Sequence, residues 1–111
     1  MSVSLEYSYN INKDGSDKAH ILRNMAYDFG AKTCDTQYEF EGVNRQMRRS
    51  HCIIVVTFGD EESSLEINEE LVNAFIKQAA LLSRVYLECI YNSNNEIIYT
   101  SKYFKNKKQT K

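Results

Sequence analysis

The chain contains no proline and no tryptophan, and it has only four glycines and three cysteines among its 111 residues. No stretch has the Pro-, Gly- or Ser-rich composition of a linker, and there is no internal repeat, so we expect a single domain. The cysteines, Cys34, Cys52 and Cys89, are odd in number and widely spaced. This argues against a disulfide scaffold and favours a reducing compartment.

Long apolar runs are also absent. None approaches the ~20 residues that a membrane-spanning helix needs, and residues 1–6 lack the basic-then-apolar layout of a secretory signal. We therefore expect no membrane association and a cytoplasmic location, in the host cytoplasm if the protein is viral. Apolar residues at 42% and charged residues at 26% are ordinary globular values, so wholesale disorder is not expected.

The abundant residues point to an origin. Asn, Lys, Ile, Tyr and Phe together make up more than a third of the chain, and all five have AT-rich codons. This composition is typical of an AT-rich genome, such as that of a phage, a virus or a low-GC bacterium.

In the first half of the chain, the spacing of apolar residues indicates a strand, then a helix, then a second strand. Residues 3–11 alternate between apolar and polar side chains, which indicates a half-buried strand. Ser16 is a suitable N-cap for a helix whose apolar residues recur at helical spacing, and Gly30 suits its C-terminal end. Residues 36–41 alternate again and predict a second strand. Residues 43–50 are polar and basic, so we expect a connection there.

The second half begins with residues 51–58, which are apolar on both faces and indicate a strand in the middle of a sheet. After an acidic loop, residues 68–82 predict a helix with an asparagine N-cap and two first-turn glutamates. Residues 85–91 and 96–104 are strand-like, and the Asn/Ser-rich residues 92–95 between them suit a hairpin turn.

The predicted order of elements is β-α-β-β-α-β-β. It favours an α+β, ferredoxin-like β-α-β-β-α-β sandwich with an extra C-terminal hairpin strand, both helices on one sheet face and the 51–58 strand central. We expect residues 1–104 to form this domain and residues 105–111 to form a flexible basic tail. Another α+β sandwich topology is the alternative.

RNA-recognition motifs share this scaffold and stack bases on aromatic residues of one central strand. When that signature is aligned on Phe58, Ile53 and Val55 occupy the stacking positions, and both glycines of the signature are missing. The similarity therefore stops at the scaffold, and this family is not assigned.

Ile53 and Val55 have a different significance. In the expected fold they lie on the sheet face that the helices leave uncovered, and exposed apolar residues there are commonly covered by a partner. A homodimer is the simplest cover, since one surface serves both copies, and another protein would also serve. Two alternatives stay open: the C-terminal hairpin folds over this face, or the two side chains are tolerated in water.

Basic residues cluster in two places, and they suggest nucleic-acid or phosphate-ligand binding. The alternative is that both clusters are simply solvated charge, and the acids of residues 60–70 make the molecule bipolar rather than basic. The clusters are the predicted connection, with Arg45, Arg48 and Arg49, and the tail, with Lys102, Lys105, Lys107 and Lys108.

Motifs for metal binding and catalysis are not found. The sequence has no Cys-x₂-Cys or His-x₃-His pair for zinc, and His51 and Cys52 are strand neighbours that point to opposite faces. Glu39 and Glu41 are about 7 Å apart on one strand face, which suits an acid/base pair but also the charged guard of a sheet edge. We assign no catalytic residue, metal or cofactor.

The sequence therefore predicts a small, non-enzymatic, protein-binding accessory module with a regulatory or inhibitory role. A nucleic-acid or phosphate binder is the alternative, and a small hydrolase using the paired glutamates is a third hypothesis.

Overall fold

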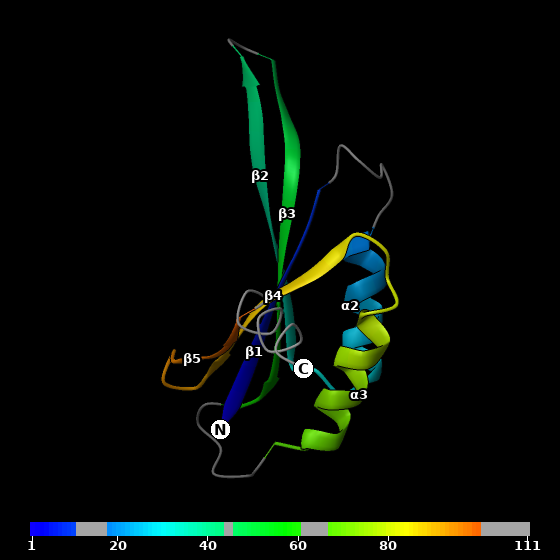
Figure 1. The fold of residues 1–111 in the computed structure, drawn as a ribbon, viewed down its shortest axis with the longest axis vertical. Helices are drawn as coiled ribbons and strands as arrows, with labels where there is room; N and C mark the ends of the chain where they lie inside the picture. The colour runs from blue at the N-terminus through cyan, green and yellow to red at the C-terminus, as the bar shows by residue number, and fades with distance from the viewer. Residues whose placement is uncertain (11–17, 44–45, 61–66, 101–111) are drawn as a thin grey trace, which may run out of the picture.

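A computed structural model describes residues 1–10, 18–43, 46–60 and 67–100, leaving aside the side chains of residues 39–43, 46–50 and 99–100. Five antiparallel strands form one sheet, and two helices lie on one of its faces (Figure 1). The prediction of a small α+β protein is thereby confirmed. The predicted N-cap Ser16 and the tail 105–111 lie outside the described residues.

The sheet has the strand order β2-β3-β1-β4-β5, with β1 in the middle. The expectation that residues 51–58 form the central strand is wrong: β1 is the middle one of the five described strands, because it pairs with β3 on one side and with β4 on the other. The elements along the chain are β1 (Ser2–Asn10), α2 (Lys18–Asp28), β2 (Thr33–Val43), β3 (Gln46–Gly59), α3 (Glu69–Ala79), β4 (Val85–Asn92) and β5 (Ile97–Thr100).

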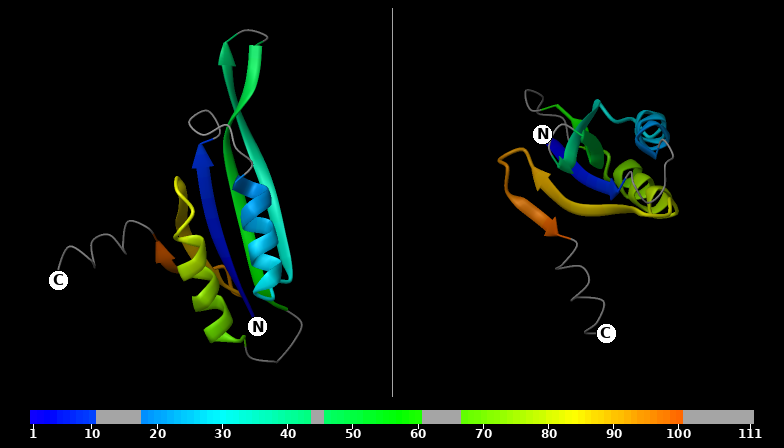
Figure 2. Two further views of the ribbon diagram at one scale, coloured as in Figure 1. Left: turned by 90° about the vertical axis from the view of Figure 1, so that its right-hand side faces the viewer. Right: turned by 90° about the horizontal axis from the view of Figure 1, so that it is seen from above.

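Strands β2 and β3 are longer than the sequence predicts. Their pairing continues through a bulge at Glu39/Phe40 as far as the pair Val43 and Gln46, so the expected loop over residues 43–50 is wrong for the residues that are described. Backbone ladder bonds need no apolar side chains, and polar composition alone therefore does not end a hairpin. The result is a two-stranded arm that projects beyond the helices (Figures 1 and 2).

The core lies between the sheet and the helices, and Phe75 of α3 is at its centre with no exposed surface. Its ring meets the rings of Phe58 at 5.5 Å, Tyr7 at 5.9 Å and Phe29 at 6.2 Å between centroids. Tilted and edge-on arrangements at such distances are favourable for aromatic pairs. These contacts join α3 to β1, to β3 and to the segment that follows α2.

Helix α3 begins as predicted. The Asn68 side chain accepts a hydrogen bond from the Leu71 backbone N–H at 3.3 Å, and Glu69 and Glu70 lie in the first turn. The cap satisfies one donor that the helix itself leaves unpaired, and the two carboxylates complement the helix dipole.

Two glycines have left-handed backbone conformations, with φ of +83° at Gly59 and +90° at Gly30. A Cβ at Gly59 would overlap the backbone oxygen of Met1 and lie 3.0 Å from Ile67 Cγ1. At Gly30 the nearest atom would be Leu71 Cδ1, at 3.8 Å. Both positions favour glycine by conformation, but only Gly59 does so by space as well.

We expect Gly59→Ala to destabilise the fold more than Gly30→Ala. The left-handed conformation alone costs about 1–2 kcal/mol for alanine, and at Gly59 the ends of β1 and β3 must also separate. Urea unfolding followed by circular dichroism measures both variants, with m-values compared to verify a common mechanism. Equal losses in the free energy of unfolding would contradict this account of Gly59.

Candidate functional site

The sheet face opposite the helices, called the open face below, carries Ile53 and Val55. Cross-strand pairing places Ile53 opposite Ser8 of β1, and Val55 opposite Glu6 of the same strand. Both aliphatic side chains are partly exposed, whereas Ile54, between them, has an exposed fraction of 0%. Two apolar side chains therefore lie side by side along the interior strand β3, with polar residues next to them.

The polar side chains of the open face are hydrogen-bonded to one another. Ser4 Oγ and Thr57 Oγ1 are 3.0 Å apart across β1 and β3. Ser8 donates its hydroxyl to Glu88 Oε1 at 2.7 Å, which links β1 to β4. Because these groups already have partners, covering them does not leave a buried polar group without a hydrogen bond.

Glu6 is the centre of a second set of bonds on this face. The Tyr91 hydroxyl donates to Glu6 Oε1 at 2.6 Å, and the Cys89 thiol donates to Oε2 at 3.8 Å. Hydrogen bonds to Cys89 and Glu6 raise the pKa of Tyr91, and burial adds to the effect. Burial is the main cause that raises the pKa of the Cys89 thiol. At neutral pH both groups keep their protons and act as donors, so neither has the properties of an activated nucleophile.

The other candidate catalytic residues do not form a site among the described residues. His51 lies partly exposed on β3, and Cys52 beside it is fully buried on the helix side. Glu39 and Glu41 belong to β2, where their backbone partners across the hairpin are His51 and Arg48. The side chains of both glutamates lie outside the described ones, so their use as an acid/base pair stays a prediction.

The predicted basic cluster is divided by the structure. Arg48 and Arg49 belong to the projecting arm of β3, with Glu41 and Phe40 as their respective backbone partners. Arg45 lies outside the described residues, as do the tail lysines, Lys102, Lys105, Lys107 and Lys108. An acidic residue opposite Arg48 reduces the net positive charge of this part of the arm.

A different donor-rich surface lies at the base of the arm. Arg23 and His20 of α2 line a cleft of about 120 Å³ together with Thr36 and Tyr38 of β2. Arg23 Nη2 donates to the Cys34 carbonyl oxygen at 3.3 Å, which orients the guanidinium group along the cleft wall. The sequence did not suggest this cleft, because its residues come from two elements with no shared motif.

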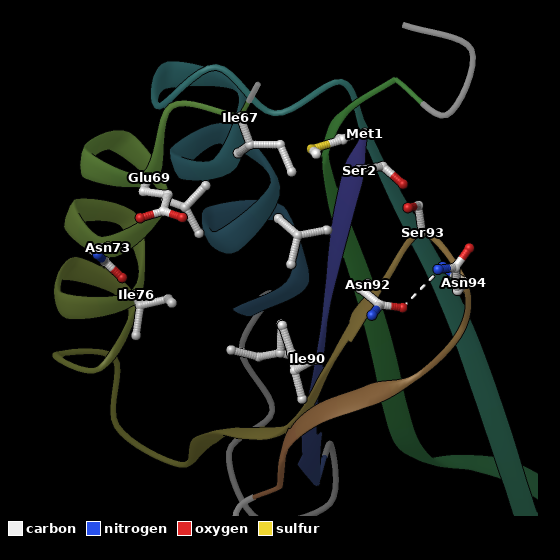
Figure 3. A pocket seen from close by; sticks show the side chains of 13 residues that line it. Met1, Ser2, Ile67, Glu69, Asn73, Ile76, Ile90, Asn92, Ser93 and Asn94 are labelled. Carbon is white, nitrogen blue, oxygen red and sulfur yellow. Dashed lines mark hydrogen bonds between the residues drawn. The ribbon is translucent and has the colours of Figure 1, made fainter. Parts of the chain in front are cut away.

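A larger pocket of about 500 Å³ lies between α3 and the end of β4, and no sequence pattern pointed to it either (Figure 3). Val3, Val72, Ile76 and Ile90 give it apolar walls. Its polar residues are Ser2, Glu69, Asn73, Asn92, Ser93 and Asn94, and Met1, Ile67 and Ile98 complete the lining. We call it the α3 pocket. Its volume is in the range of small-ligand sites.

Side chains that could bind a metal are dispersed in the described part of the chain. Within those ranges, no three His, Cys, Asp or Glu side chains are grouped closely enough to hold a metal ion. Cys34, Cys52 and Cys89 are all buried free thiols. None of the described helices has the length and apolar character to cross a bilayer.

Comparison with known proteins gives no assignment: neither a protein-family model nor a curated protein sequence matches this chain. Function is therefore inferred from the open face, the cleft and the α3 pocket.

The raised pKa of Tyr91 predicts a pH dependence of stability. The folded state favours the protonated phenol, so its contribution is fully present below the ordinary tyrosine pKa of 10.0 and is lost as the pH rises above it. We expect Tyr91→Phe to flatten the fall in the free energy of unfolding above about pH 10. The exposed Tyr86 gives the matched control, Tyr86→Phe. Identical pH slopes for the two variants, measured by urea unfolding, would refute the role of Tyr91.

Proposed function

We propose that this protein is a non-enzymatic, protein-binding accessory module with a regulatory or inhibitory role, and that it pairs with a second copy through the open face. The observation that carries the proposal is the sheet itself: helices cover one face, and Ile53 and Val55 stay partly exposed on the other. Apolar side chains in the interior of an uncovered sheet favour contact with another surface.

The hydrogen bonds on the open face support the same proposal. Covering a polar surface is unfavourable when its groups lose water without gaining partners. Here Ser8 and Glu6 already have hydrogen-bond partners on β4, which offsets part of the free energy lost when an incoming surface removes their water. Tyr86, with an exposed fraction of 59%, pairs with Ser8 at the margin of this face. Tyrosine is enriched in protein interfaces.

Charge constrains the pairing of two copies. Glu6, Asp35 and Glu88 lie around the two aliphatic residues, and a two-fold axis through the open face would bring two sets of carboxylates together. Like charges repel over roughly a Debye length, about 10 Å at 0.1 M salt. We therefore expect self-association to strengthen as salt concentration rises.

We also propose that the part of the fold preceding β5 is a ferredoxin-like arrangement. The β-α-β-β-α-β order of these elements and the neighbour order β2-β3-β1-β4 support this assignment. The arrangement is one scaffold for many functions, so it adds no information about a reaction.

The double variant Ile53→Lys, Val55→Lys should make the protein monomeric, because burying two ammonium groups in an interface is strongly unfavourable. Sedimentation velocity at low and at high salt measures the oligomeric state of both chains. A protein concentration of about 100 µM populates a dimer whose dissociation constant is in the micromolar range. Leu81→Lys is the control, since Leu81 is exposed and follows α3, which lies on the other side of the sheet. A wild-type chain that stays monomeric at every salt concentration would refute the self-association.

The competing proposal is a phosphate or nucleic-acid ligand held by Arg45, Arg48 and Arg49, together with the lysines Lys102, Lys105, Lys107 and Lys108. The donor-lined cleft at Arg23 is the observation that favours it. Binding of this kind weakens with salt, which is the opposite of the dependence expected for the open face.

Replacing the three arginines by alanine should weaken binding of a single-stranded or duplex oligonucleotide. It should also reduce the slope of log K against log salt by about one unit for each phosphate that an arginine no longer neutralises. Fluorescence anisotropy measures this, and Lys77→Ala on α3 is the control. An unchanged affinity would exclude the arm as a nucleic-acid surface.

A further inference from the structure

We propose that the α3 pocket and the outer edge of β5 together bind an extended peptide segment of a partner protein. One large apolar side chain of that segment enters the pocket, and a cationic side chain lies beside Glu69. This site is separate from the open face, and the proposal does not depend on self-association.

The pocket favours an apolar side chain with polar groups around it. Val72 of α3 and Val3 of β1 line the pocket. Ile76 of α3 lies across it from Ile90 of β4, and the side chains of Asn73 and Asn92 lie at its margins (Figure 3). Such walls remove an apolar group from water. The Asn92 side-chain oxygen accepts from the backbone N–H groups of Asn94 and Glu96, so the Asn73 side-chain amide is the marginal group that would hydrogen-bond to a peptide backbone. An extended peptide supplies both features at once.

Strand β5 supplies the backbone partner. It is the last strand of the sheet, and no described strand pairs with its outer edge, which lies at the side of the sheet remote from β2 (Figure 2). Its sequence, Ile97–Thr100, contains no charged residue or proline, the usual means of protecting an edge. The opposite edge, β2, carries Asp35, Glu39 and Glu41. The two edges therefore differ in their readiness to accept another strand.

Ile98 connects the edge to the pocket. It belongs to β5, lines the α3 pocket and has an exposed fraction of 57%. A strand that pairs with β5 therefore runs past the pocket, and alternate side chains of that strand point toward α3. This is the arrangement of peptide recognition by strand addition, in which the ladder gives affinity and a pocket gives specificity.

The charge at the pocket selects a cationic peptide. Glu69 lines the α3 pocket, and Glu69 and Glu70 both line the hollow next to it. No lysine, arginine or histidine of the described residues lines either of them. Met1 lines both, and its ammonium group donates to the Asp60 carbonyl oxygen, so two carboxylates outnumber one ammonium group there. A Lys or Arg two residues from the apolar anchor would lie on the same side of the added strand, near these carboxylates.

The test uses the full-length chain and the synthetic probe acetyl-Thr-Val-Thr-Phe-Thr-Lys-Thr-amide. We expect titration into ¹⁵N-labelled protein to shift the backbone resonances of Ile98, Ile90 and Asn73. A probe with Ala in place of Phe should bind about tenfold more weakly or worse, because burial of an aromatic side chain contributes at least that factor. The backbone N–H groups of the Phe and of the threonine that follows it point to opposite edges of the probe, so N-methylation of one of these two residues should also weaken binding.

Three substitutions in the protein make the test specific. Ile98→Lys should abolish probe binding, whereas Ile97→Lys, at an equally exposed neighbour that does not line the pocket, should change affinity by less than about threefold. Glu69→Gln should remove the preference for the Lys probe over one with Gln at that position. Thermal unfolding of each variant verifies that the fold is retained.

The proposal is overturned if the probe does not bind at millimolar concentration, if the Phe and Ala probes bind equally, or if Ile98→Lys leaves the affinity unchanged. Its failure is distinguishable from failure of the open-face dimer. The double variant Ile53→Lys, Val55→Lys alters only the open face, so it should bind the probe as the wild-type chain does.

Discussion

The pairing of β1 with two strands from distant parts of the chain is the constraint on which the rest of the structure depends. β1 bonds to β3 along nine residue pairs and to β4 along seven more, so the first strand holds the centre of the sheet. Its alternation directs Leu5 and Tyr7 to the helices and Ser4 and Glu6 to the open face. Both faces of the molecule are therefore specified by one strand.

The two faces differ in how they are stabilised. On the helix side, the aromatic cluster around Phe75 removes apolar surface from water and holds α3 against β1 and β3. On the open side, cross-strand hydrogen bonds to Glu6 satisfy polar groups without a covering layer. The apolar core and the hydrogen bonds of the open face therefore lie on opposite sides of the sheet. A contact made on the open face would not require the core to rearrange.

The α3 pocket is formed by residues from several separate elements, so no single segment of the sequence contains it. Helix α3 and the β4–β5 turn lie on opposite sides of this pocket (Figure 3). Val3, Ile76 and Ile98 meet there from three elements that are far apart in sequence. The cleft at Arg23 has the same origin, since a helix and an edge strand contribute to it.

The sequence by itself determined the type of each element and the α+β class, because hydrophobic periodicity and the Asn68 cap depend on neighbouring residues only. It did not determine where the β2–β3 hairpin ends, since ladder bonds pair polar residues 46–50 as readily as apolar ones. It also did not place β1 at the sheet centre, which depends on the pairing of β1 with both β3 and β4. Strand neighbours, pocket walls and the partners of Glu6 are long-range contacts, and only the folded chain brings them together.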